Sequence, residues 1–279
     1  MSEAATKAQL PRLSPALAVE LFATFNLAFL ALDVFLAHDA NDFADAREWA
    51  PVVFSAVAPL FLVSGLVLGI RRPWGKTVGL AVGYGSVLVG VIGLVLHLES
   101  AFFQRQTLRD LVYAAPFVAP LSYAGVGLLL VLNRLESDRE ASFGRWIALL
   151  AMGGFTGNFL LSLLDHAQNG FFYASEWVPV VAAAYGASFL LPVVLGERGS
   201  AYLRLCSGVL AVQAAVGIVG GALHVVANLD ARADSLYERF IYGAPAFAPL
   251  LFVDLALLAG IGLWQIASTR VEPVLVSPP

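Results

Sequence analysis

Eight long apolar runs decide what this chain can fold into. A helix that crosses a bilayer needs about 20 mainly apolar residues, and these runs lack the alternation expected of strands. Only 13% of the 279 residues are charged, against about 25% in soluble domains, so lipid is the natural solvent. The runs are Pro15–Ala37, Pro51–Ile70, Thr77–His97, Leu111–Leu132, Trp146–Leu164, Trp177–Leu195, Leu205–Val226 and Phe240–Ile266. The sequence therefore predicts an all-α integral membrane protein with eight transmembrane helices embedded in the lipid bilayer.

The basic residues predict which way the helices run. Eleven of the 16 Lys and Arg residues, including both lysines, lie in the two terminal segments and in the loops at 71–76, 134–145 and 198–204. The positive-inside rule places that side in the cytoplasm, so both termini are expected there. Short loops without an extramembrane domain indicate a bacterial inner membrane.

The two halves of the sequence align with each other. Segment 38–53 matches segment 166–181 without gaps, sharing His, Asn, Phe, Ala, Glu, Trp, Pro and two Val residues. Further matches follow at Gly-x-x-Gly-x-x-x-His and at Tyr-x-Ala-Pro-x-x-Ala-Pro-Leu. These matches predict two pseudo-symmetric four-helix repeats in parallel orientation. The predicted division is a cytoplasmic tail at 1–14, a first repeat at 15–134, a second repeat at 144–268 and a cytoplasmic tail at 269–279.

The chain has four histidines, His38, His97, His166 and His224, and each closes an apolar run that should end at the outer face. An imidazole near a bilayer is costly unless it is paired or faces a polar interior, so each histidine is a candidate functional residue. Their repeated positions favour a shared ligand role for a transition metal ion (Fe, Cu, Mn or Zn) or for haem iron. The alternative is that imidazoles at helix C-termini only stabilise the helix ends.

Two glutamates, Glu48 and Glu176, follow their histidines by ten residues in register. They are candidate metal ligands alongside the imidazoles. Each also precedes Trp-x-Pro, and an acidic residue ahead of a proline is ordinary chemistry for a helix start. The two interpretations remain open.

Glycine stripes lie beneath two of the histidines. Gly90 and Gly93 share a helix face with His97, and Gly217 and Gly220 repeat this spacing before His224. A helix face without side chains leaves room for a flat macrocycle such as haem, so these glycines are candidate cofactor-binding residues. Close helix packing through small residues is the alternative.

Prolines and acidic residues complete the candidates. Pro120 and Pro249 fall inside the fourth and eighth runs, where each frees a carbonyl one turn back. Asp254 lies about 14 residues into the last run, which places it near mid-membrane, and Asp33 lies five residues before His38. Both acids are candidates for proton relay or transport. A hydrogen bond to a residue such as Asn26 is the alternative.

The plan of the chain resembles that of haem A synthase, which has eight helices, two four-helix halves and four histidines near the outer face. That family carries its ligands on the even-numbered helices, with a glutamate shortly before each histidine. Here the histidines end odd-numbered helices and the glutamates follow them, so no residue role is carried over.

The leading hypothesis is a membrane metalloprotein with a redox or electron-transfer role, an oxidoreductase partnered by a quinone or by other membrane subunits. A small-solute or ion transporter and a non-catalytic membrane subunit are the alternatives. The lone Cys206 excludes an internal disulfide or a cysteine cluster. No phosphate-binding motif is found, and the basic residues are topology signals, so no nucleic-acid partner is expected.

Overall fold

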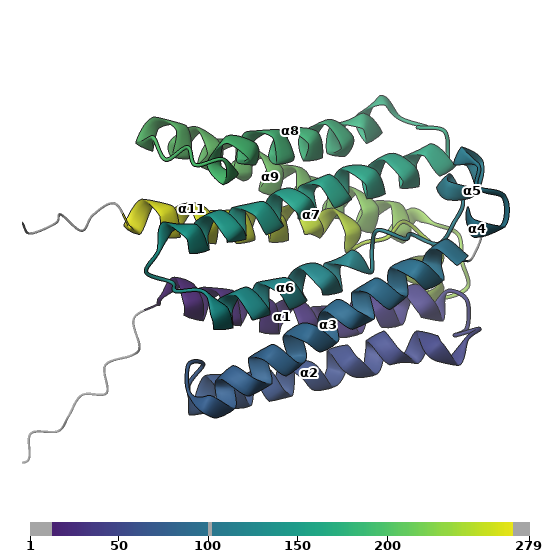
Figure 1. Cartoon of the computed structure of the whole chain (residues 1–279). Coiled ribbons are helices and arrows are strands. Elements are labelled where there is room, and N and C mark those ends of the chain that lie inside the picture. The colour runs from purple at the N-terminus through teal and green to yellow at the C-terminus, as the bar shows by residue number, and fades with distance from the viewer. Residues whose placement is uncertain (1–12, 100–101, 270–279) are drawn as a thin grey trace, which may run out of the picture.

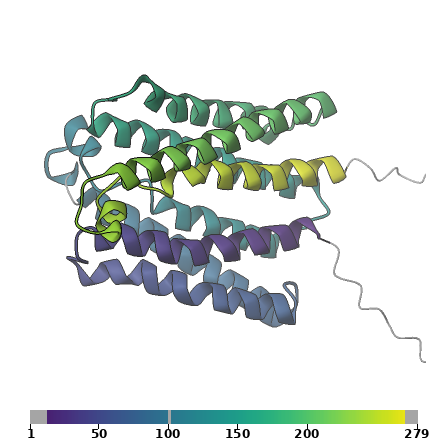
Figure 2. The same cartoon turned by 180° about the vertical axis from the view of Figure 1, so that it is seen from behind.

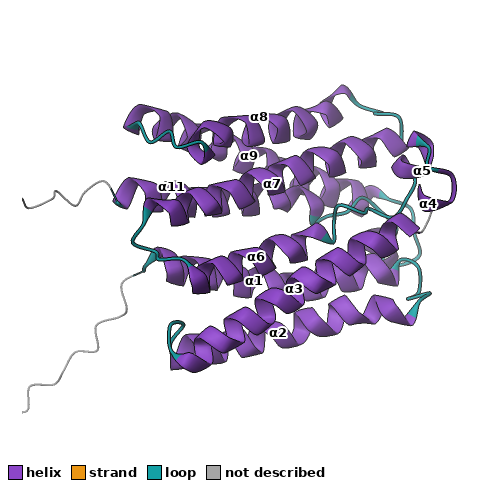
Figure 3. Cartoon of the chain, viewed as in Figure 1, coloured by secondary structure: helices purple, strands orange, loops and turns teal. Residues whose placement is uncertain are grey.

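The computed structural model describes residues 13–99 and 102–269, and the regular elements in these ranges are helices (Figure 3). Seven of them are long and apolar enough to cross a membrane, which confirms the prediction of a multipass helical membrane protein. They are α1 (Pro15–Asp39), α2 (Trp49–Leu68, preceded by η1, Ala46–Glu48), α3 (Pro73–Glu99), α7 (Ala141–Gln168), α8 (Trp177–Val194, preceded by η2, Ala174–Glu176), α9 (Ser200–Asp230) and α11 (Leu251–Ser268, preceded by η3, Ala248–Leu250).

The fourth predicted span is shorter than expected. In place of Leu111–Leu132 the chain forms α5 (Leu108–Val112) and, nine residues later, α6 (Leu121–Leu135) with 15 residues. Pro116 and Pro120 lie in the interval, and a proline neither donates a helical hydrogen bond nor lets the preceding residue adopt helical geometry easily. The prediction of a continuous helix was therefore wrong between Val112 and Leu121.

The last predicted run is cut in the same way. Its start at Phe240 belongs to α10 (Leu236–Ile241), and α11 begins only at Leu251, just after Pro249. A further short helix, α4 (Phe102–Arg105), lies in the loop before α5. In the described part of the chain the structure thus gives seven helices of spanning length and one shorter apolar helix.

The seven long helices and α6 form two groups that correspond to the two halves of the chain (Figure 1). The first half contains α1, α2, α3 and α6, and the second contains α7, α8, α9 and α11. The halves meet where α1 lies beside α11 and where α6 lies beside α7, as the view from behind also shows for α1 and α11 (Figure 2). Helix α1 begins and α11 ends on the same side of the bundle, which we call the terminus end. We call the opposite side, where the four histidines lie, the histidine end.

The outward faces of the bundle are apolar. Leu60, Val67, Leu88, Val212 and Ile218 are each more than half exposed. A helical bundle with this surface and few charges is solvated by lipid, so contact with membrane lipid is a property of the fold.

Small residues let the helices inside each half approach closely. A Cβ added at Gly83 of α3 would lie 3.0 Å from the carbonyl oxygen of Gly127 in α6. In the second half a Cβ at Gly144 of α7 would lie 2.7 Å from the carbonyl oxygen of Gly262 in α11. Such backbone contact is the usual way membrane helices gain packing energy.

Candidate functional site at the histidine end

The structure groups the four histidines by half. The ring centroids of His38 and His97 lie 6.3 Å apart, with the rings nearly perpendicular. In the second half His224 lies close enough to act electrostatically on both His166 and its neighbour Asp165. We call these the first and second histidine pairs.

Backbone carbonyls orient three of the imidazoles. Nδ1 of His97 lies 3.1 Å from the carbonyl oxygen of Pro116, and Nδ1 of His224 lies 2.9 Å from that of Pro245. Nδ1 of His38 lies 3.0 Å from the carbonyl oxygen of Val34. A carbonyl only accepts, so Nδ1 carries the proton and, in the neutral ring, Nε2 is the nitrogen with the lone pair.

The prolines explain why those carbonyls can accept a histidine. Pro120 and Pro249 have no N–H, so Pro116 and Pro245, each four residues earlier, lack their helical donor. In a membrane each freed carbonyl needs another partner. The structure supplies an imidazole from the neighbouring helix, together with a turn hydrogen bond from three residues ahead.

Each pair has a glutamate beside it. Glu48 lies close enough to His97 to act on it electrostatically, and Oε2 of Glu176 lies 3.5 Å from Nδ1 of His166. Oε1 of Glu48 accepts a hydrogen bond from Asn41 at 3.2 Å. Among the described residues, however, Oε2 of Glu48 and Oε2 of Glu176 are buried without a hydrogen-bond partner.

The loops that carry these glutamates share one strained shape. Phe43 and Phe171 have φ angles of 49° and 54°, which is uncommon for a bulky residue. Each ring stacks on a tryptophan, with centroids 4.1 Å apart for Phe43 and Trp49 and 4.0 Å apart for Phe171 and Trp177. Strain of this kind persists only where the surroundings hold it, and here the stacked tryptophan is the neighbour of each strained phenylalanine.

Loops from one half reach over the other. Tyr237 of α10 donates a hydrogen bond to Asp39, next to His38. In the reverse direction Gln168, two residues after His166, donates to the carbonyl of Val112 at 2.9 Å. The bond to Asp39 raises the pKa of the Tyr237 phenol. These contacts were not predicted, because no local sequence signal connects the two halves.

The glycine stripes do not face open space. A Cβ at Gly90 would lie 2.8 Å from the carbonyl oxygen of Pro120, and one at Gly93 would lie 2.8 Å from the Pro120 side chain. Gly217 and Gly220 meet Pro249 in the same way, at 2.7 and 3.0 Å. The following helix fills the room foreseen for a macrocycle, so the alternative of close packing describes these four glycines and the haem interpretation of the stripes does not.

The two intramembrane acids lie on α11 and on α1. Asp254 is in the first turn of α11, which starts after Pro249, and it lies level with Asn26 at the middle of α1. Its carboxylate accepts a hydrogen bond from Asn26 of α1 at 2.9 Å, which is the predicted alternative. Asp33 lies on α1 near Tyr123 of α6, on which it acts electrostatically.

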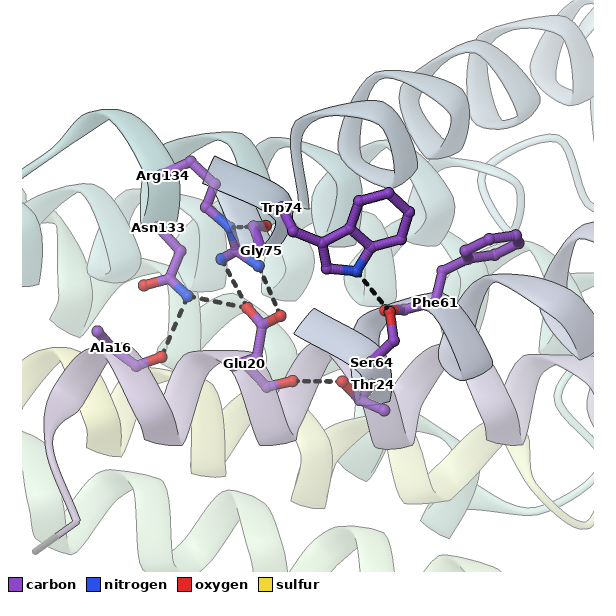
Figure 4. A network of polar contacts seen from close by, with 9 residues as sticks. All are labelled: Ala16, Glu20, Thr24, Phe61, Ser64, Trp74, Gly75, Asn133 and Arg134. Atoms are coloured by element: carbon purple, nitrogen blue, oxygen red, sulfur yellow. Dashed lines mark hydrogen bonds and ion pairs between the residues drawn. The ribbon is translucent and has the colours of Figure 1, made fainter. Parts of the chain in front are cut away.

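A buried ion pair at the terminus end was not predicted (Figure 4). Nη1 and Nη2 of Arg134 in α6 lie 2.7 and 2.6 Å from the two carboxylate oxygens of Glu20 in α1. Asn133 donates to Glu20 at 3.1 Å, and Nε of Arg134 donates to the carbonyl of Gly75 at 3.1 Å. The sequence pattern predicts Arg134 to lie in a loop as a topology signal, whereas the structure places it inside α6.

Within residues 13–99 and 102–269, no three His, Cys, Asp or Glu side chains lie close enough together to form a ready-made metal site. Comparison with protein-family models, with curated proteins and with solved structures gives no match for this chain. The interpretation of the site therefore depends on its own geometry.

Proposed function

We propose that this membrane protein binds divalent transition-metal cations at its histidine end, with one site in each half. The first site would use His38, His97 and Glu48, and the second His166, His224 and Glu176. The observation that carries the proposal is one buried carboxylate oxygen on each glutamate that makes no hydrogen bond to the described residues, with Oε2 of Glu176 only in a 3.5 Å ion-pair contact with His166. A buried acceptor without a partner needs an explanation, and a bound ion or water is a common one.

The imidazoles support the proposal through their second nitrogen. A metal-ligating histidine usually donates its other N–H to a carbonyl or carboxylate, which fixes the ring and the tautomer. His38, His97 and His224 have this arrangement with backbone carbonyls. Two imidazoles and one carboxylate suit Zn, Cu, Fe or Mn. Because the three side chains are neighbours rather than a finished coordination sphere, rotation of the side chains would complete the site.

The transporter alternative has lost one of its supports, because Pro120 and Pro249 lie at the starts of helices instead of bending them. Duplication of the four-helix unit, which both hypotheses share, stays a proposal that the paired loop geometry supports. We therefore favour cation binding, with a redox role if the ion is Cu or Fe.

Titration of purified protein with ZnCl₂ and CuCl₂, by calorimetry and by metal analysis, tests the proposal. We expect two cations per chain for the natural protein and one for His38→Ala or His166→Ala. Glu48→Gln combined with Glu176→Gln should weaken binding about tenfold or more. Glu99→Gln, an exposed carboxylate at the same end, is the matched control. Absence of stoichiometric binding, or equal binding by all variants, would overturn the proposal.

We further propose that the terminus end faces the cytoplasm of a bacterial inner membrane. Burial of Arg134 removes one basic residue from the count, which leaves ten on that side against five on the other. The asymmetry required by the positive-inside rule is kept. A reporter fused after residue 279 that is active only in the cytoplasm tests this orientation.

A further inference from the structure

We propose that an apolar groove between α9 and α11 binds one membrane phospholipid, with an acyl chain in the groove and the phosphate group at Arg204. The groove belongs to the second half of the chain, and the corresponding helices of the first half close over the same position. This inference is independent of the proposed metal sites, because none of the residues that line the groove is a proposed metal ligand.

The groove is an open hollow of about 300 Å³. Its lining comes from between residues 207 and 214 of α9 and from between residues 253 and 260 of α11. The hydroxyl group of Ser207 donates to the Leu203 carbonyl of its own helix at 2.9 Å, so its proton is already in use. The other lining side chains are those of Ala, Val and Leu, and Gly260 adds no side chain. A lining of this kind fits a hydrocarbon ligand.

The two halves pack this pair of helices differently. In the first half α3 and α6 meet backbone to backbone, since a Cβ on Gly127 would lie 2.5 Å from the carbonyl oxygen of Gly83. The aligned residues of α9 and α11 are Leu210 and Ala256, whose side chains are buried between the helices. Figure 2 shows α9 and α11 diverging toward the terminus end. The groove therefore follows from the larger residues at these two positions.

The groove is continuous with the lipid-facing surface of the bundle. Ser207 and Ala211 are exposed, and Leu257 on the opposite wall is 60% exposed. The lining on α9 extends for about 10 Å at 1.5 Å per residue. Half of the hydrocarbon core of a bilayer is about 15 Å thick. An acyl chain from the leaflet at the terminus end can therefore follow the groove for most of its length.

Arg204 and Trp264 continue the two walls of the groove toward the terminus end. Arg204 precedes Ser207 by three residues and Ala211 by seven, so it lies on the side of α9 that carries these lining residues. Trp264 follows Gly260 by four residues, which places it on the lining side of α11. An arginine and a tryptophan at the end of an apolar groove are the residues expected where a lipid headgroup begins.

Antiparallel packing brings these two residues to the same level. A Cβ on Gly217 of α9 would lie 3.0 Å from the Cβ of Phe252 in α11. Arg204 lies 13 residues before Gly217, and Trp264 lies 12 residues after Phe252. Because the two helices run in opposite directions, equal steps in these two senses lead to one level near the terminus end.

The charge of Arg204 selects a phospholipid as the occupant. Its side chain is exposed and makes no hydrogen bond or ion pair with the described residues. A guanidinium group matches the geometry of a phosphate and can donate two parallel hydrogen bonds to it. The isoprenoid tail of a quinone would also fit an apolar groove, but a quinone carries no anionic group for the arginine. The acyl chain and the phosphate of one phospholipid satisfy both parts of the site.

Native mass spectrometry of the full chain in detergent micelles, after addition of phosphatidylglycerol, tests the groove. We expect one bound phospholipid per chain. Gly260→Leu should weaken binding about tenfold or more, because the leucine displaces at least two methylene groups of the acyl chain. No atom lies within 4 Å of a Cβ at residue 260, so the fold should tolerate the substitution. Ala211→Leu, which fills the groove from the other wall, should have the same effect.

Gly125→Leu in α6 is the matched control, because a Cβ at residue 125 also has no atom within 4 Å and residue 125 does not line the groove. Its lipid binding should equal that of the natural protein. Unchanged binding in Gly260→Leu and Ala211→Leu, or the same loss in Gly125→Leu, overturns the proposal. A bound quinone in place of the phospholipid, or a dimer that excludes lipid, overturns it as well.

A second comparison tests the phosphate contact. Arg204→Gln should weaken the binding of phosphatidylglycerol about fivefold. It should leave unchanged the binding of a diacylglycerol with the same acyl chains, which lacks the phosphate. Arg139→Gln, an exposed arginine in a loop at the same end, controls for general attraction of anionic lipid. Equal weakening by the two arginine substitutions, or unchanged binding in Arg204→Gln, overturns the headgroup site.

Discussion

Arg134 and Glu20 form a bidentate ion pair between α6 and α1, and both side chains are fully buried. Loss of one partner leaves an uncompensated buried charge. We predict that Glu20→Ala or Arg134→Leu lowers the free energy of unfolding by about 3–5 kcal/mol. The double variant, which copies the aligned Ala148 and Leu263, should be more stable than either single variant. Unfolding in mixed micelles measures this, with exposed Arg139→Gln as the control. A double variant whose loss is the sum of the two single losses would contradict it.

Gly79 of α3 allows this pair to form. A Cβ at residue 79 would overlap the guanidinium group of Arg134. We predict that Gly79→Ala displaces Arg134 and costs about 1–3 kcal/mol of stability. Gly153→Ala in α7 is the matched control because no atom lies within 4 Å of its added Cβ. There the higher helix propensity of alanine should leave stability unchanged or raise it by up to about 1 kcal/mol. Equal effects of the two substitutions would refute the prediction.

The apolar runs predicted the helical membrane fold because lipid imposes length and composition on each span locally. Reasoning from the local sequence alone wrongly placed Arg134 in a loop. A charge at the end of an apolar run is usually a topology signal, and its partner Glu20 lies 114 residues away. Glu20 itself was the available clue, since a carboxylate inside a predicted span requires a partner.

The candidate site was predictable as a set of residues but not as an arrangement. Repeat positions related His38 to His166, whereas the structure places His38 beside His97. Which histidines become neighbours depends on how the helices pack across the bundle, and the alignment of the two halves carries no information on that packing. The start of α11 at Leu251 was missed for a simpler reason, namely that hydropathy does not register the interruption at Pro249.

The hydrogen bond between Asn26 and Asp254 connects the two halves at 2.9 Å. Hydrogen bonds between membrane helices contribute about 0.6 kcal/mol on average and up to about 1.7 kcal/mol. We predict a coupling energy of about 0.5–2 kcal/mol in a double-mutant cycle of Asn26→Ala and Asp254→Ala, measured by unfolding. The cycle isolates the pair from the separate cost of each truncation. A coupling energy of zero would show that the two side chains only fill space between the halves.

Tyr237 holds α10 against α1 through Asp39, and this contact should depend on pH. The bond raises the pKa of the phenol, so the neutral form is the one that the fold stabilises. The contact is therefore fully present below the ordinary tyrosine pKa of about 10 and is lost as pH rises through the higher value in the folded protein. Ultraviolet titration measures tyrosinate formation, and the difference between natural protein and Tyr237→Phe isolates this residue. We predict that Asp39→Asn moves the isolated step to lower pH, because an amide stabilises the phenol less than a carboxylate does. A step that stays in place would mean that Asp39 does not hold the phenol.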